Sequence, residues 1–248
     1  MGIRLPAPRR RAYEIPRRAS SAGMRIAVLS DIHASRPALE AVLADVDRVR
    51  PDGIWAAGDL VGYYPWPNEV LEILRSRGVL AIRGNHDRAA LTGDLSLFND
   101  RAAEALRWTR VHLLPAGVGF LKGLPDRRRE AVLGVDIAMY HGSPRHDDEY
   151  VYPWNAHEEL LDLARAEVVL LGHTHLPMAL TSGSRLLANP GSVGQPRDGD
   201  PRASWGLLDV ERRSFEVRRV PYDLGAVAAE VRRAGLPEEL ADRLAAGV

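Results

Sequence analysis

Short polar motifs follow predicted strands at five places along the chain, and this arrangement restricts its possible folds more than any other feature. Where such strands run parallel, their carboxyl ends lie along one edge of the sheet, which is the usual place for a ligand site. We therefore expect five separate segments to deliver polar side chains to one crevice. The motifs are Asp31-x-His33, Gly58-Asp59, Gly84-Asn85-His86-Asp87, His141-Gly142 and Gly172-His173-x-His175.

The order of apolar runs predicts a mixed α/β fold. Strand-like runs at residues 24–30, 53–57 and 79–83 are separated by stretches with helical spacing, which favours a parallel sheet in the N-terminal half. Later in the chain, turn residues divide the predicted strands into hairpins at residues 131–140, 177–188 and 203–220. Parallel strands early and antiparallel strands late fit two packed mixed sheets flanked by helices better than a three-layer sandwich.

The charge distribution sets the first residues apart from the rest. Residues 1–23 hold six arginines and one acid, while the whole chain has a net charge of zero, so the remainder has a net charge of −5. We predict that residues 1–23 are a disordered basic extension or result from an upstream start site, and that residues 24–248 form one domain. Within this domain, residues 99–112 indicate an exposed helix and residues 115–124 a short segment, and residues 99–124 together could form a helical cap. A slightly acidic body gives no strong indication of nucleic-acid binding.

Composition excludes several classes of protein. The chain has no cysteine, so disulfides and thiolate metal sites are excluded. No stretch approaches the roughly 20 apolar residues of a membrane span, and the basic head lacks the apolar region of a secretory signal. We therefore expect a cytoplasmic protein that does not enter a membrane. The simplest role for the two predicted helices at the C-terminus is to cover a sheet. An interface of a homo-oligomer is the alternative role for them.

The side chains in the five motifs are those of a metal site. Carboxylate, amide oxygen and imidazole ligands without thiolates suit Mn, Fe, Ni, Co or Zn. One ion rarely needs seven protein ligands, whereas two divalent ions that share a bridging carboxylate do, and we assign the bridge to Asp59. The seven candidate metal ligands are Asp31, His33, Asp59, Asn85, His141, His173 and His175.

The complete motif series, in this order, resembles that of the calcineurin-like metallophosphoesterases. The flanking stretches at residues 58–63, 141–144 and 189–194 resemble a bacterial and archaeal branch related to small phosphodiesterases, and the resemblance covers about residues 24–220. It implies a four-layer αββα sandwich. It also implies a dinuclear metal-dependent phosphoesterase that hydrolyses a small phosphodiester or phosphomonoester by attack of a metal-activated hydroxide.

The resemblance also implies a role for each matching residue. One ion would be held by Asp31, His33 and His175, the other by Asn85, His141 and His173, and Asp59 would bridge the two. His86 would be catalytic, contacting the phosphate and protonating the leaving oxygen, and Asp87 would orient it.

Three residues near the motifs are candidates for substrate binding. Arg145 and Arg197 could bind a phosphate through two parallel hydrogen bonds, and Tyr63 could line the substrate pocket. Solvated arginines and loop packing are the alternatives for these positions. Two other functions also stay open: a non-catalytic metal-binding interaction scaffold on the same fold, and a metal-dependent hydrolase of another bond such as an amide.

Overall fold

A computed structural model describes residues 23–248 of the chain. The prediction of a basic extension concerns residues 1–23 and therefore lies, apart from Gly23, outside the described residues. Within the described part, no helix is long and apolar enough to cross a bilayer.

The first sheet combines parallel and antiparallel strands. It contains β1 (Arg25–Leu29), β2 (Gly53–Ala56), β3 (Leu80–Ala81), β9 (Ala203–Asp209) and β10 (Ser214–Val220), in the order β10-β9-β1-β2-β3. The three N-terminal strands are parallel, and β9 pairs antiparallel with both β1 and β10. The predicted parallel strands of the N-terminal half and the hairpin predicted at residues 203–220 thus lie in the same sheet.

The second sheet also has five strands. They are β4 (Arg127–Val132), β5 (Val135–Tyr140), β6 (Val168–Leu170), β7 (Pro177–Ser182) and β8 (Arg185–Pro190), in the order β4-β5-β6-β8-β7. The central strands β5, β6 and β8 are parallel, while the edge strands β4 and β7 pair antiparallel with their neighbours. Both predicted hairpins are present here, and the first begins earlier, at Arg127, than predicted.

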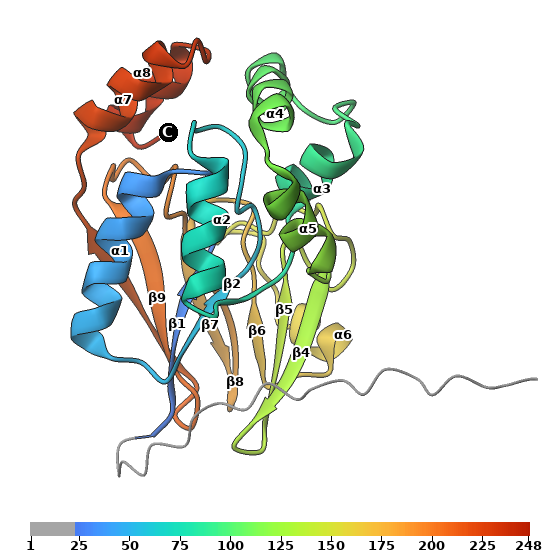
Figure 1. The fold of residues 1–248 in the computed structure, drawn as a ribbon. Helices are drawn as coiled ribbons and strands as arrows, with labels where there is room; N and C mark the ends of the chain where they lie inside the picture. The colour runs from blue at the N-terminus through green and yellow to red at the C-terminus, as the bar shows by residue number, and fades with distance from the viewer. Residues whose placement is uncertain (1–22) are drawn as a thin grey trace, which may run out of the picture.

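The two sheets face each other across an apolar core, and helices cover their outer faces (Figure 1). Alternate residues of each strand point into this core or toward a helix, as strand geometry requires. The helices α1 (Arg36–Val49) and α2 (Pro67–Ser76) pack on the first sheet, and α6 (Glu159–Ala164) packs on the second. The predicted arrangement of two mixed sheets flanked by helices is therefore confirmed.

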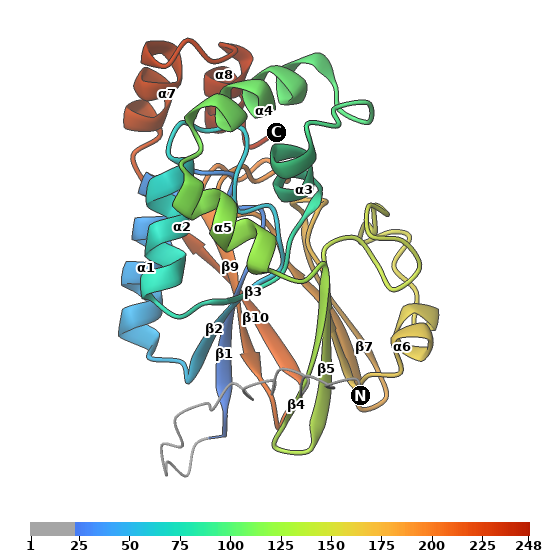
Figure 2. The ribbon, with the colours of Figure 1, turned by 45° about the vertical axis from the view of Figure 1, so that its right-hand side comes forward.

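Most of the remaining helices gather near the carboxyl ends of the parallel strands (Figure 2). These are α3 (Asn85–Thr92), α4 (Asp100–His112), α7 (Leu224–Arg233) and α8 (Glu239–Ala246), while α5 (Pro115–Gly123) packs beside α2. The predicted cap over residues 99–124 coincides with α4 and α5, although the second of these was expected only as a short segment. Side chains of α4, α7 and α8 share one apolar cluster with Tyr63 and Tyr64.

Candidate metal centre and active site

All seven candidate metal ligands lie where strands end. The segments that follow β1, β2, β3, β5 and β6 meet at one edge of the two sheets, because these strands all run in the same direction within their sheets. Six of the seven side chains are buried, and Asn85 is partly buried. Four ligands come from the first sheet and three from the second. The first sheet supplies Asp31, His33, Asp59 and Asn85, and the second supplies His141, His173 and His175.

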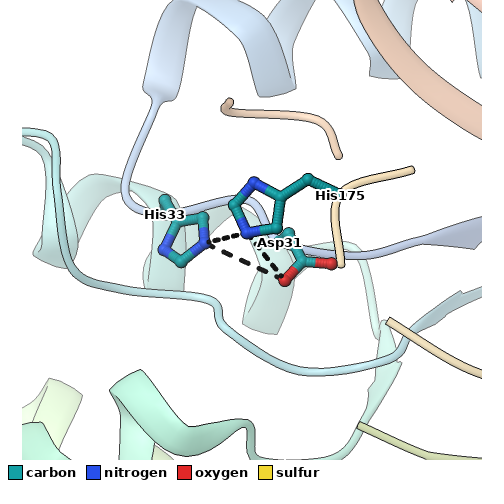
Figure 3. A group of neighbouring side chains, drawn as sticks. All are labelled: Asp31, His33 and His175. Atoms are coloured by element: carbon teal, nitrogen blue, oxygen red, sulfur yellow. Dashed lines mark hydrogen bonds and ion pairs between the residues drawn. The ribbon is translucent and has the colours of Figure 1, made fainter. Parts of the chain in front are cut away.

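Asp31, His33 and His175 form the first group of donors (Figure 3). The Nε2 atoms of His33 and His175 are 3.1 Å apart. An oxygen of Asp31 lies 3.3 Å from Nε2 of His175 and 3.9 Å from Nε2 of His33. One donor atom of each residue therefore points to a common centre, although Asp31 and His175 are far apart in the sequence.

A second group lies beside the first. Nε2 of His141 is 3.0 Å from the side-chain oxygen of Asn85 and 3.3 Å from Oδ2 of Asp59. His173 joins this group, since one donor atom each of Asp59, His141 and His173 lie within 4.8 Å of one another. This is the same set of residues that the resemblance assigns to one ion and the bridge.

Asp59 lies between the two groups. Its Oδ2 atom is 3.3 Å from Nε2 of His141 in the second group and 3.7 Å from Nε2 of His33 in the first. Its other oxygen, Oδ1, accepts a hydrogen bond from the backbone N–H of His86 at 2.9 Å. His33, Asp59 and His86 also form a third set of converging donor atoms. The geometry therefore permits two roles for His86: it could bind a metal ion itself, or it could lie next to the ligand Asp59 without binding one.

The ring nitrogens that face each centre offer lone pairs when the rings are neutral. Nδ1 of His175 donates to the carbonyl oxygen of Gln195 at 2.5 Å, and Nδ1 of His141 donates to that of Ala57 at 2.8 Å. In a neutral imidazole the opposite nitrogen is then an acceptor. These acceptors face carboxylate or amide oxygens, and Nε2 of His173 has no hydrogen-bond partner within residues 23–248. Converging acceptors without a donor fit a cation, and a backbone carbonyl behind a ring is common for metal-binding histidines.

The charges of the cluster also favour cations. Burial raises the pKa of Asp31 to about 7, and the charge of Asp59 acts in the same direction. Burial lowers the pKa of His141, but the charges of Asp59 and Asp31 outweigh it and raise this pKa to about 9. Burial lowers the pKa of His173 to about 3 and keeps those of His33 and His175 well below the usual value. Most of the imidazoles are thus neutral, as metal ligation requires.

Metal binding to this cluster is expected to release protons. In the metal-free protein near pH 7, His141 is protonated because its pKa of about 9 lies above that pH. A metal must displace this proton, so affinity should fall by about tenfold for each unit of pH below about 9 and fall more steeply below about 7, where Asp31 also takes up a proton. Calorimetric titration with Mn²⁺ in two buffers of different ionisation enthalpy counts the released protons. An affinity that stays constant between pH 6 and 9 would contradict this expectation.

The ligand segments have unusual backbone conformations. Asp31, His33, Asp59, His173 and His175 all have positive φ angles, between 50° and 70°. A left-handed backbone conformation at a residue other than glycine costs about 1–3 kcal/mol. It persists only where the surrounding structure fixes it, typically at functional sites. The donor geometry is therefore set by the backbone of the folded chain.

His86 lies at the first turn of α3, against the ligand cluster. Its ring packs on those of His33 and Tyr63, each at a centroid distance of 4.6 Å, and on that of Phe98 at 4.9 Å. Gly62, at φ 94°, leaves room for it, since a Cβ there would lie 2.4 Å from Nδ1 of His86. Burial lowers the pKa of His86 to about 4, so the ring is neutral near pH 7.

Comparison with known families agrees with this site. A sequence profile of the calcineurin-like phosphoesterase superfamily domain matches residues 24–213. The chain belongs to the calcineurin-like phosphoesterase superfamily. As members of this family are metal-dependent, the donor groups described above are its candidate metal-binding residues.

Relatives span bacteria and archaea. The protein MJ0912 of Methanocaldococcus jannaschii is 34% identical over 240 residues, covering 90% of this chain and 98% of its own. Phosphodiesterase YfcE of Escherichia coli K12 is 29% identical, covering 75% of this chain and 88% of its own. The crystal structure of a metallophosphoesterase from Sphaerobacter thermophilus is 38% identical and aligns with a TM-score of 0.80, covering 91% of this chain and all of that one. The chain is a phosphoric ester hydrolase of this superfamily.

The predicted role of Asp87 in this calcineurin-like phosphoesterase stays a prediction, and the structure shows other partners for this residue. The resemblance implied that Asp87 orients His86, but the carboxylate of Asp87 accepts hydrogen bonds from the backbone N–H groups of Gly84, Leu60 and Val61, at 2.9–3.1 Å. No hydrogen bond joins it to the His86 ring within the described residues, and Nδ1 of that ring has no partner there. Asp87 therefore fixes the backbone that carries Asp59 and His86.

The predicted substrate-binding residues have different surroundings. Tyr63 is buried beside His33, with ring centroids 4.4 Å apart, and its hydroxyl accepts a hydrogen bond from Arg197 at 3.2 Å. Arg145 is instead ion-paired with Glu149 at 2.6 Å and with Glu159 at 3.5 Å. Tyr63 and Arg197 thus lie beside the ligand cluster of the phosphoesterase, whereas the guanidinium of Arg145 is occupied by two acids.

Two contacts of the phosphoesterase site were not predicted. The carbonyl of Gln195 accepts from His175, and the ring of Tyr150 packs on that of His173 at 3.9 Å. Gln195 directly follows the motif at residues 189–194, which could have indicated its place. Tyr150 lies in the long connection between β5 and α6, whose path no sequence pattern reveals.

Proposed function

We propose that the protein is a dinuclear metal-dependent phosphodiesterase, with phosphomonoesters as a second substrate class. The observation that carries this proposal is the position of Asp59, whose Oδ2 atom faces His33 of one donor group and His141 of the other. A carboxylate between two groups of ligands suits a pair of ions, because a single ion would leave several of the buried donors unused.

Each proposed ion would have its own set of ligands. One ion would be held by Asp31, His33 and His175 and the other by Asn85, His141 and His173, with Asp59 shared. Divalent cations bound there would supply positive charge to phosphate oxygens and lower the pKa of water. The candidate ions are Mn, Fe, Ni, Co and Zn, since the donors are carboxylate, amide and imidazole.

His86 would contact the substrate phosphate. As a neutral ring with a pKa of about 4, it can donate one N–H hydrogen bond to a phosphate oxygen near pH 7. Protonating the leaving oxygen would require the negative charge of the substrate to raise that pKa. Arg197 and Tyr63 would contact the phosphate side of the site, whereas Arg145 is left out because its guanidinium is paired with acids.

A diester is the proposed substrate class. This choice is supported by the relative YfcE, whose name is phosphodiesterase. The leaving groups that the enzyme accepts would be selected by the loops and helices around the cluster, and not by the buried ligands.

Chelation is expected to abolish hydrolysis of bis(p-nitrophenyl) phosphate. The protein would be treated with a chelator, dialysed, and assayed after addition of Mn²⁺, Ni²⁺, Co²⁺, Zn²⁺ or Mg²⁺ in turn. Activity should return with at least one transition metal, and titration should saturate at about two ions per chain. Full activity in the chelated protein, or saturation at one ion, would contradict the dinuclear proposal.

A further inference from the structure

A pocket of about 450 Å³ lies beside the second group of donors. Its wall includes Asn85 and His173, which are two of the residues proposed to hold one ion. The rest of the wall comes from α3, from the connection between α3 and α4, and from the connection between β5 and α6. Ligand sites usually measure about 300–1,000 Å³, so a pocket of this size suits a small organic group. A group esterified to a phosphate at that ion would therefore have room in this pocket.

Two aromatic rings in the pocket wall contact histidines of the site. Tyr150 packs on the ring of His173 at a centroid distance of 3.9 Å. Phe98 meets the ring of His86 edge-on, at a centroid distance of 4.9 Å. The pocket thus borders the metal centre through Tyr150 and the proposed catalytic histidine through Phe98. An ester group in this pocket would contact aromatic side chains while its phosphate stays at the metal centre.

Apolar side chains of the wall are left in contact with water. Tyr150 is 46% exposed and Leu97 is 85% exposed, although both line the pocket. Removing apolar surface from water is favourable, so a ligand that covers these side chains gains affinity from them. The wall therefore favours an ester group with an apolar surface.

The charges of the wall disfavour an anionic ester group. Within residues 23–248, the wall contains the guanidinium of Arg88 and the carboxylates of Asp94 and Asp148. Arg88 is ion-paired with Asp148 and lies 3.9 Å from Asp126, so acids already balance its charge. A second phosphate or a carboxylate on the substrate would thus meet an excess of negative charge, and like charges brought together weaken binding. An uncharged ester group fits this pocket better.

We propose that this pocket binds an uncharged aromatic ring system on one ester group of the substrate. The inference rests on the proposed function, because it places the phosphate at the ligand cluster. An aromatic group is favoured over an aliphatic one because pairs of aromatic rings attract each other more strongly than their contact area alone predicts. Nucleobases stack on aromatic side chains of proteins in this way. Nucleosides and simpler aryl alcohols are the two kinds of ester group that carry such a ring.

The test compares inhibitors that share a phosphonate and differ in the organic group. Hydrolysis of bis(p-nitrophenyl) phosphate by the metal-loaded protein would be inhibited with benzylphosphonate, cyclohexylmethylphosphonate or propylphosphonate. Benzylphosphonate should inhibit about three- to tenfold more strongly than cyclohexylmethylphosphonate, because the two groups are similar in size and only the first can form aromatic pairs.

A second pair of inhibitors distinguishes the two sources of the ring. Adenosine 5′-phosphate and ribose 5-phosphate differ only in the base. An advantage of about fivefold or more for the nucleotide assigns the ring to a nucleoside. An advantage for benzylphosphonate alone assigns it to a simpler aryl alcohol.

Variants locate the effect. Tyr150→Leu and Phe98→Leu should each reduce the advantage of benzylphosphonate by about twofold or more, with propylphosphonate as the internal reference for any general change in the site. Tyr150→Phe should keep the advantage, because the ring remains. Two leucine variants on different connections guard against one that fails to fold or loses metal, and circular dichroism and elemental analysis check both.

Trp154→Leu is the matched control. This ring lies in the same connection as Tyr150 and is 75% exposed, and among the described residues it is not part of the pocket wall. It is separated from Tyr150 by the ring of Tyr152, which stacks on both. The Trp154→Leu variant should therefore keep the full advantage of benzylphosphonate.

Three results would overturn the inference: no advantage for either aromatic inhibitor in the unaltered protein, a full advantage in both Tyr150→Leu and Phe98→Leu, or a loss in Trp154→Leu equal to that in Tyr150→Leu. A protein that hydrolyses the diester but shows one of these results refutes the aromatic pocket alone. A protein that hydrolyses no ester with any metal refutes the proposed function itself.

Discussion

Replacing His86 by alanine is expected to lower the turnover of a phosphodiester by about 10²- to 10⁴-fold while the metal content of the protein stays the same. The ring lies against the ligand cluster, at 4.6 Å from the ring of His33, but it is not in either set of residues proposed to hold an ion. Its loss should therefore affect the phosphate in the transition state and leave the metals bound. Turnover would be measured with bis(p-nitrophenyl) phosphate and metal content by elemental analysis.

The control for this variant is His157→Ala, which removes an exposed histidine outside the cluster and should leave both quantities unchanged. If His86→Ala loses one ion, His86 is a ligand, as its distance to His33 and Asp59 permits. A set of diesters with increasingly basic leaving groups separates the two proposed roles. A defect that grows with leaving-group basicity indicates proton donation, and a constant defect indicates a hydrogen bond to phosphate.

The substitution Asp59→Asn is expected to remove bound metal as well as activity. The carboxylate is shared by the two donor groups, at 3.7 Å from His33 and 3.3 Å from His141. Burial opposes its ionisation, yet the positive charge of His141 and a hydrogen bond from that ring outweigh it and keep the pKa of Asp59 well below its usual range, so a full negative charge is lost. The fall in metal affinity should exceed the roughly 10- to 100-fold that loss of an outer hydrogen-bond partner costs.

Asparagine is close to aspartate in shape and retains an oxygen that can accept from the backbone N–H of His86, so the fold should persist. Asp87→Asn serves as the comparison, because this neighbouring buried carboxylate binds only backbone amides. It should lower the free energy of unfolding by about 1–3 kcal/mol and keep the metal. Metal titration and urea unfolding of both variants check these expectations. Asp59→Asn with two tightly bound ions would show that Asp59 is not the bridge.

Much of the fold was predictable because most strands are short, largely apolar runs bounded by turn residues; β4, with the sequence RRREAV, is an exception, and its start was missed. The helix α5 was not, because Gly117, Gly119 and Gly123 give this segment a low intrinsic helix propensity. Packing explains the helix that forms: Leu121 is fully buried, and Gly117 lies so close to Leu113 that a Cβ would come within 2.8 Å of its side chain. Tertiary contacts of this kind leave no periodic signal in the sequence.

The candidate ligands were predictable for a different reason. Asp31, Asp59 and His173 each lie within three residues of the end of a strand, so the sheet topology alone brings them to one edge. The role of Asp87 could not be obtained in this way, because its partners are backbone amides, which every residue possesses. The contact of Tyr150 with His173 depends on how a long loop folds back, and only the structure shows it.

Because the ligands come from both sheets, the stability of the fold should depend on the concentration of free metal. Asp31, His33, Asp59 and Asn85 come from one sheet and the three remaining histidines from the other, so the proposed ions would cross-link the two halves of the sandwich. Anything that binds only the native state stabilises it in proportion to the logarithm of its free concentration. The lifetime of this protein would then rise and fall with the free metal around it, so that metal scarcity would lower its abundance in addition to its activity.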